Sequence, residues 1–341
     1  MSLLSGLYGR AARFRRAWYG RHPDRARQLR QPVVSIGNLV VGGSGKTPVV
    51  AALARLLSAS GERPAILSRG YGRRRSAATV VVVSDGRDVL TTSEVSGDEP
   101  QMLARARLGA PVIVSTERYL AGRLAEETLG CTVHLLDDGF QHVQLARDLD
   151  LLIVTRADLD EHVLPSGRLR EPLDAAVAAD ALLVGGTDED AAVIGKRLGV
   201  GTTFRITRRY ETPKLVQPFG APLPPSIGRR VVAVAGIARP ERFFAALRAE
   251  GWEVAAELVF RDHHWYTAKD LVSIERAALD ARADLVMTTE KDAVRLDLVA
   301  GVEPNWAFLP LHVEIEPAGP FAAWIGDRLA AARRRRGVVA A

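Results

Sequence analysis

The sequence predicts an α/β protein with a mainly parallel sheet covered by helices, followed by a second, smaller α/β lobe. From Pro32 onward, short aliphatic and β-branched runs alternate with helical patterns, which is typical of a parallel sheet buried on both faces. Five prolines fall between residues 212 and 230, as in a linker between lobes. We therefore divide the chain into a basic N-terminal segment (1–30), a first lobe (31–211), a linker (212–230) and a second lobe (231–341). Two lobes imply a cleft between them.

The elements follow from the same alternation. A first strand at 33–36 leads into a helix at 47–60, which Gly61 stops. Further strands of the first lobe are expected at 65–67, 80–83, 112–114, 133–136, 151–154 and 181–184. The second lobe is expected to hold strands at 231–235, 254–259, 285–288 and 308–315, with helices at 240–250, 267–283 and 321–332.

Composition narrows the class of protein. The chain has 341 residues, of which 47% are hydrophobic and 25% charged, so it is long enough for about two globular domains. A single cysteine, Cys131, cannot form an internal disulfide, and no cleavable signal is evident, which favours the cytoplasm. The longest apolar runs have the length of strands and fall short of the ~20 residues of a membrane-spanning helix.

The net charge of +6 is concentrated at the N-terminus. Residues 1–30 contain eight arginines against the single acid Asp24. On a helix, Leu3, Leu7 and Phe14 share one apolar face with their neighbours. Such a helix either lies in a membrane interface with arginines on anionic lipid, or docks its apolar face on the protein's own core. Nucleic acid is not expected as a partner, because no RNA- or DNA-binding motif accompanies the charge.

A glycine-rich loop follows the first strand and carries the strongest chemical signal. The loop reads G-N-L-V-V-G-G-S-G-K-T-P from Gly37 to Pro48, so backbone amides and a helix N-terminus would converge on a phosphate. Lys46 would reach the β- and γ-phosphates of ATP, and the Thr47 hydroxyl would ligate Mg²⁺. The expected nucleotide-binding residues are Val40, Val41, Gly42, Gly43, Ser44, Gly45, Lys46 and Thr47. These features predict a P-loop NTPase-like first lobe, although Val40 replaces the first glycine of the usual pattern.

A second signal is the pair Asp137 and Asp138, which ends an apolar strand two or three βα units after the loop. P-loop enzymes keep an acid for Mg²⁺ at such a strand end, because the carboxyl ends of parallel strands meet at one edge of the sheet. Two adjacent aspartates without a cation would repel each other. We therefore expect a metal site at this edge, and a charged turn is the simpler alternative.

Read in order, the motifs resemble those of the tetraacyldisaccharide 4'-kinase family, the lipid A 4'-kinases of Gram-negative bacteria. Besides the loop they are S-R-G-Y-G from Ser68, G-D-E-P from Gly97, D-D-G-F-Q-H from Asp137, L-R-E-P from Leu169, A-G-I-A-R-P from Ala235 and T-E-K-D-A-V from Thr289. They cover almost the whole chain. One departure is Ser166 to Arg168, where this family more often has a small residue, glycine and proline.

The resemblance implies an ATP-dependent kinase that phosphorylates the 4'-hydroxyl of a tetraacylated glucosamine disaccharide 1-phosphate, in lipid A and lipopolysaccharide biosynthesis. Its partners would be this glycolipid and the inner-membrane surface, where the enzyme would be peripheral on the cytoplasmic face; no obligate protein partner is indicated. Under this reading the N-terminal helix would contact the bilayer.

The resemblance also implies residue roles. Asp98 would be the general base of an in-line transfer, with His263, in preference to His264, orienting it. Asp137, Asp138 and Glu171 would surround Mg²⁺ with Thr47, and three further neighbours of the site are expected: Gln141, His142 and Arg118.

Three alternatives remain. A membrane-recruited ATPase switch of the deviant Walker A type would carry a second lysine where this loop has Val41. A non-catalytic nucleotide-binding or lipid-surface module would give the acidic residues of these motifs no role. A GTPase would need an Asn/Thr-Lys-x-Asp segment for guanine, and none is present at the expected place.

Overall fold

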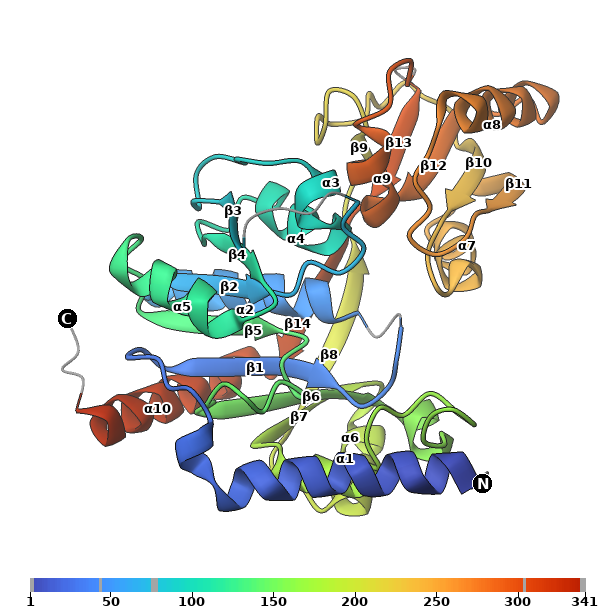
Figure 1. Ribbon diagram of the computed structural model, residues 1–341. Helices are drawn as coiled ribbons and strands as arrows, with labels where there is room; N and C mark the ends of the chain where they lie inside the picture. Colours follow the sequence, from blue (N-terminus) through green and yellow to red (C-terminus); the bar gives the residue numbers. More distant parts are fainter. Residues whose placement is uncertain (1–2, 43–44, 75–78, 303–304, 338–341) are drawn as a thin grey trace.

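The computed structural model describes residues 3–42, 45–74, 79–302 and 305–337. The chain forms two lobes, each built on one sheet, with the smaller lobe set apart at one end of the molecule (Figure 1). The sheet of the larger lobe has nine strands in the order β14-β8-β7-β6-β1-β5-β2-β4-β3. These strands are β1 (Val33–Asn38), β2 (Pro64–Ser68), β3 (Val80–Ser84), β4 (Val112–Ser115), β5 (Val133–Asp137), β6 (Leu149–Thr155), β7 (Ala181–Gly185), β8 (Thr203–Tyr210) and β14 (Leu311–Glu316).

Strand β1 lies inside the larger sheet, between β5 and β6, and pairs with both in parallel. All six of its residues are buried, as expected for a strand covered on both faces. Among the described strands of this larger sheet, only the edge strands β3 and β14 pair antiparallel to their neighbours. The carboxyl ends of β1, β2, β4 and β5 therefore meet at one edge of the sheet, where the phosphate loop begins.

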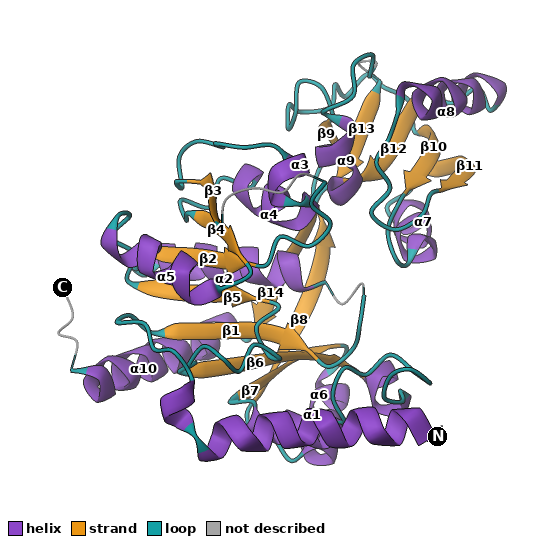
Figure 2. Cartoon of the chain, viewed as in Figure 1, coloured by secondary structure: helices purple, strands orange, loops and turns teal. Residues whose placement is uncertain are grey.

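Helices cover both faces of this sheet (Figure 2). On one face the core is formed with α2 (Lys46–Ala59), α4 (Asp98–Arg105) and α10 (Ala318–Arg336). On the other face α5 (Arg118–Glu127) and α6 (Asp188–Leu198) close two further hydrophobic clusters. Short elements complete the lobe: α3 (Ser93–Ser96), η1 (Pro23–Arg25), η2 (Arg156–Asp160) and η3 (Leu173–Ala178). The α/β class and the helix-covered parallel sheet predicted from the sequence are confirmed.

The sheet of the smaller lobe has five strands in the order β11-β10-β12-β13-β9. They are β9 (Lys214–Leu215), β10 (Arg230–Ala235), β11 (Glu253–Val259), β12 (Leu285–Thr289) and β13 (Trp306–Leu309). Helix α7 (Pro240–Ala249) packs on one face, and α8 (Ala268–Asp280) with α9 (Glu290–Leu296) packs on the other. Strand β9 lies within the proline-rich segment, so part of that expected linker is the edge of this sheet.

The end of the chain differs from the expected boundary at 231–341. The run expected as one strand at 308–315 is two strands, β13 and β14, separated by Pro310, and they belong to different sheets. Strand β14 pairs with β8, and Phe321, Ile325 and Leu329 of α10 join the core of the larger lobe. A proline has no N–H for a strand ladder, which suits the point where the chain leaves one sheet for the other.

Helix α1 (Leu3–Arg21) docks on the larger lobe through small residues instead of its apolar face. Ser5 and Gly9 are its buried positions, whereas Leu3, Leu7 and Phe14 are 84%, 54% and 68% exposed. The interpretation of an apolar face packed on the protein's own core is therefore wrong. Within the described residues no helix combines the length and apolarity needed to cross a bilayer.

Candidate active site

The phosphate loop connects β1 to α2, and glycine makes its conformation accessible. Gly45, directly before α2, has φ of +73°, a left-handed value that side chains disfavour. Val40 bridges Leu169, and the Val41 amide donates to the Arg168 carbonyl at 2.8 Å, so a second segment supports the loop. The expected roles of Gly43 and Ser44 lie outside the described residues.

Lys46 lies in a network of polar groups at the ends of β1 and β5. Its Nζ donates to Asn38 Oδ1 at 3.1 Å and lies 3.4 Å from Asp138 Oδ1. Arg170 donates to both oxygens of Asp138, at 2.8 and 2.7 Å. Burial raises the pKa of Asp138, but the hydrogen bonds and charges of Arg170 and Lys46 outweigh it and hold the pKa far below its usual value. Asp138 is therefore ionised and already neutralised by cations.

Asp137 has the opposite electrostatic environment. Its Oδ2 accepts from the Ser68 hydroxyl at 3.0 Å, while its Oδ1 is buried without a hydrogen-bond partner. Burial, followed by the negative charges of Glu99 and Asp138, raises the pKa of Asp137 to about 7. A buried carboxylate oxygen without a donor is suited to a cation, since a cation would stabilise the ionised form that burial and the neighbouring negative charges disfavour.

The residues at this edge fit Mg²⁺ only in part. Hydroxyl and carboxylate oxygens such as those of Thr47 and Asp137 are its preferred ligands. In the described part of the chain, however, no three acidic, histidine or cysteine side chains converge as a metal cluster. Glu171 instead forms an ion pair with Arg16 of α1 at 2.7 Å, and both side chains are largely buried. Its role as a metal ligand stays a prediction, and its contacts do not support it.

Asp98 begins α4 and is 2% exposed. His263, from the smaller lobe, lies with Nδ1 2.8 Å from Asp98 Oδ2. Burial raises the pKa of Asp98, but the hydrogen bond with His263 and the charges of Lys291 and Arg295 outweigh it and lower the pKa. The structure therefore brings together Asp98 and His263, the two residues expected to form the base and its partner, from different lobes.

The neighbouring histidine has a different partner. His264 Nε2 lies 3.1 Å from Asp270 Oδ2, near the start of α8. His263 itself has a φ of +60°, unusual for a residue with a side chain. Its backbone amide donates to the Gly236 carbonyl, in the A-G-I-A-R-P segment. Because the His263 side chain contacts Asp98 and the His264 side chain contacts Asp270, His263 is favoured over His264 as the partner of Asp98.

Two cations of α9 complete the Asp98 cluster. Lys291 Nζ lies 3.1 Å from His263 Nε2, 3.2 Å from Asp262 Oδ1 and 3.9 Å from Asp98 Oδ2. Arg295, 1% exposed, lies 3.4 Å from Asp98 Oδ2 and donates to Asp292 at 3.0 Å. The sequence motifs predicted no role for these two residues. Their spacing of four on one helix, just after a strand end, is the signal that could have found them.

Asp137 links the two halves of the site. The charge of Glu99, the residue after Asp98, raises the pKa of Asp137, and the charge of Lys46 lowers it. The three expected neighbours lie here too. Gln141 donates to the Asn38 carbonyl at 3.1 Å. Burial and then the charges of Arg118 and three further arginines lower the pKa of His142 to about 3. The nucleotide-binding and base-bearing residues therefore share one region.

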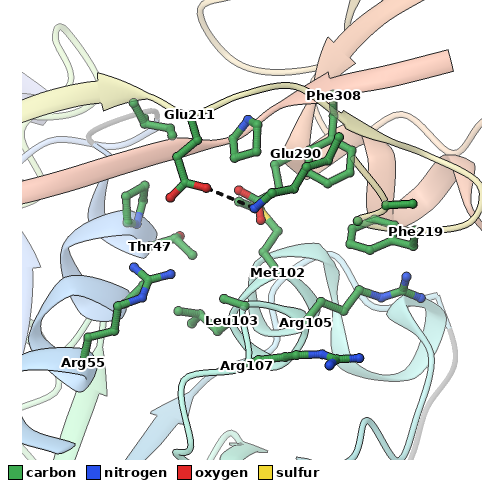
Figure 3. A pocket seen from close by; sticks show the side chains of 18 residues that line it. Thr47, Arg55, Met102, Leu103, Arg105, Arg107, Glu211, Phe219, Glu290 and Phe308 are labelled. Atoms are coloured by element: carbon green, nitrogen blue, oxygen red, sulfur yellow. Dashed lines mark hydrogen bonds and ion pairs between the residues drawn. The ribbon is translucent and has the colours of Figure 1, made fainter. Parts of the chain in front are cut away.

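A cavity of about 530 Å³ opens beside Thr47, between the lobes (Figure 3). Its lining comes from α2, α4, α9, β13 and the chain around Glu211. Figure 3 shows Thr47 and Arg55 on one side and Glu211 and Glu290 above them. Burial raises the pKa of Glu290 to about 7. The volume lies in the range of small-molecule and cofactor pockets.

Comparison with known proteins places the chain in a family. The family model described as tetraacyldisaccharide-1-P 4'-kinase matches residues 1–330. The tetraacyldisaccharide 4'-kinase of Geobacter metallireducens is 43% identical over 87% of this chain and 88% of its own length. That of Anaeromyxobacter dehalogenans strain 2CP-C is 42% identical, over 84% and 78%.

A solved structure agrees. The crystal structure of LpxK from Aquifex aeolicus in complex with ATP superposes with a TM-score of 0.77 at 32% identity, covering 96% of this chain and 97% of that one. These matches favour a metabolic kinase over the ATPase switch of the deviant Walker A type. The chain therefore belongs to the tetraacyldisaccharide-1-P 4'-kinase family and is a kinase.

Proposed function

We propose that this chain transfers the γ-phosphoryl group of ATP to the 4'-hydroxyl of a tetraacyldisaccharide 1-phosphate, with Asp98 as general base. The observation that carries this proposal is the buried Asp98, hydrogen-bonded across the lobes to His263 and electrostatically connected to the Lys46 site through Glu99 and Asp137. A base below its usual pKa is ionised at neutral pH and can accept the hydroxyl proton.

ATP would be held by the loop and by the cavity beside it. Lys46 and Arg170 would face the phosphates, while the base and ribose would extend past Thr47 into the cavity of Figure 3. Thr47 and Asp137 would hold Mg²⁺, which supplies charge neutralisation to the β- and γ-phosphates. Asp138 would orient Lys46 and Arg170 instead, because both of its oxygens accept from Arg170.

The phosphate that the lipid already carries has a suitable environment near His142. Positive charges of Arg118, Arg147, Arg15 and Arg69 all act on this histidine. Arg118 is 5% exposed, and its Nε is buried without a hydrogen-bond partner. Such a group suits a phosphate oxygen, since guanidinium donors match phosphate geometry.

The exposed apolar side of α1 supports a membrane-surface location on the cytoplasmic face of the inner membrane. Leu3, Leu4, Leu7 and Phe14 are all more than half exposed, which costs free energy in water but not at a bilayer interface. Substituting Leu3, Leu7 and Phe14 together with serine should reduce cosedimentation with anionic phospholipid vesicles. Unchanged cosedimentation would contradict a membrane role for this surface.

Labelled ATP tests the activity directly. The protein is incubated with γ-labelled ATP, Mg²⁺ and acylated disaccharides with and without the 1-phosphate, and label is sought in the lipid. We expect labelling of the 1-phosphate lipid, reduced by orders of magnitude in Lys46→Ala. Asp98→Asn should retain ATP binding while transfer falls roughly 10²- to 10⁴-fold. Label transfer at the wild-type rate in either variant would refute the assignment.

A further inference from the structure

Helix α1 is attached to the larger lobe by polar contacts made at specific points. The Ser5 hydroxyl donates to Ser166 Oγ at 2.8 Å, and Arg15 donates to the Gln141 carbonyl at 2.9 Å. Arg13 pairs with Asp174 at 2.8 Å, but both side chains are more than half exposed. Exposed pairs of this kind contribute little to stability. The attachment of α1 therefore depends on the few contacts that are buried.

The Arg16 contact with Glu171 is the ion pair among these buried contacts. The two side chains are 17% and 7% exposed, and Arg16 Nε donates to Glu171 Oε2 at 2.7 Å. The same guanidinium donates to the Phe140 carbonyl at 2.8 Å and lies over the Phe140 ring, 4.1 Å from its centroid. Arg16 thus contacts both the D-D-G-F-Q-H segment and the L-R-E-P segment.

Residues 163–171, which we name the support arm, lie between α1 and the phosphate loop. The arm pairs with the loop backbone: the Arg170 amide donates to Leu39, the Val41 amide donates to Arg168, and Leu169 bridges Val40. Arg170, the residue before Glu171, holds Asp138 and donates to Asn38 as well. Any shift of the arm would therefore displace groups that position Lys46.

We propose that Arg16 and Glu171 form a positioning pair that fastens α1 to the support arm and thereby holds the phosphate loop and Arg170 in their binding geometry. Glu171 serves this anchorage and is not a ligand of Mg²⁺. The inference rests on the proposed function, because it assigns the supported loop to ATP. It couples the helix that would lie on the membrane to the site that would bind nucleotide.

A double-mutant cycle tests the pair. Arg16→Gln, Glu171→Gln and the double variant are compared for ATP affinity by calorimetry in EDTA, without acceptor lipid. Removing one partner leaves the other charge buried and unpaired, so each single variant should weaken ATP binding about tenfold, the scale seen for supporting residues of other sites. The double variant should be no weaker than the worse single variant, because the two residues act as one unit.

Hydrogen exchange gives a readout that does not depend on turnover. Amides of residues 39–42 and of the support arm should exchange faster in Arg16→Gln, while those of the smaller lobe stay unchanged. Arg13→Gln is the matched control on the same helix and should behave as wild type in both measurements. Should Arg16→Gln fail to fold, Arg16→Lys retains one contact and should show an intermediate ATP affinity.

The same variants separate anchorage from metal ligation. If Glu171 anchors α1, the Mg²⁺ concentration for half-maximal transfer is the same in Glu171→Gln and wild type. A raised Mg²⁺ requirement in Glu171→Gln alone would overturn the proposal, as would wild-type ATP affinity and exchange in Arg16→Gln. Failure of wild type to label lipid would instead refute the proposed function, since the binding and exchange measurements use no lipid.

Discussion

Replacing His263 with alanine changes the electrostatic environment of Asp98 in a way that the structure allows to be worked out. Burial alone raises the pKa of Asp98, and the 2.8 Å hydrogen bond with His263 is the largest of the interactions that lower it. The remaining cations, Arg295 at 3.4 Å and Lys291 at 3.9 Å, stay in place in the variant. The pKa of Asp98 should therefore rise.

The size of this rise follows from the hydrogen bond. A hydrogen bond to a charged group contributes about 1.5–3 kcal/mol. Its loss should disfavour the ionised form of Asp98 by about this free energy and so raise the pKa of Asp98. Asp98 must be deprotonated to act as a base, so the acid limb of the pH–rate profile should move to higher pH. The rate lost in His263→Ala should thus be largest at low pH.

The assay is kcat measured from about pH 4 to 9 with saturating ATP, lipid and Mg²⁺. His264→Ala is the matched control, because His264 contacts Asp270 instead of Asp98, and its acid limb should stay at the wild-type position. If His263→Ala lowers kcat by one factor at every pH, or if His264→Ala moves the limb, the assignment of His263 as the partner of the base is incorrect.

Three further predictions concern single side chains. In EDTA, the melting temperature of wild type should fall as pH rises from about 4 to about 7, because folding raises the pKa of Asp137 to about 7 and disfavours its ionised form. Burial raises the pKa of Glu290 to about 7 as well, so Asp137→Asn should reduce this fall without removing it, and a fall of unchanged size would contradict the assignment. Lys291→Met should raise the pKa of Asp98 less than His263→Ala does, so kcat should decrease mainly at low pH. A decrease in kcat by the same factor at every pH would count against an electrostatic role for Lys291. Gly37→Ala should reduce the free energy of unfolding by about 1–3 kcal/mol in denaturant titrations, because the alanine Cβ would lie 2.5 Å from Phe140 Cβ. A change below about 0.5 kcal/mol would show that the strand moves to relieve this contact.

The sequence predicted most of the fold because its signals are local. Continuous apolar runs such as 112–114 and 151–154 indicated buried strands, and β4 and β6 are found there. The return of β14 to the larger sheet was not predictable, because its alternating pattern fits an edge strand of either lobe. Likewise, helical periodicity identified the apolar side of α1 but could not tell whether that side or the Ser5 and Gly9 side faces the protein.

The sequence predicted which residues belong to the candidate site better than it predicted the contacts between them. Lys46, Asp98 and His263 occupy the region expected of them. The pair Asp137 and Asp138 was expected to act together, yet Arg170 occupies one carboxylate and leaves the other with an unpartnered oxygen. This difference between the two carboxylates depends on Arg170, more than thirty positions away in the chain, and no sequence motif predicts that contact.

By itself, the sequence determined the family and the phosphate loop. The loop is one strand, one turn and one helix start, so adjacent residues supply its amides, its ammonium group and its hydroxyl. Only the tertiary structure decided the pairs Asp98 with His263, 165 positions apart, and Arg16 with Glu171, 155 positions apart. The physical reason is that a buried charge is stable only beside its partner, and burial and partner both arise when distant segments pack together.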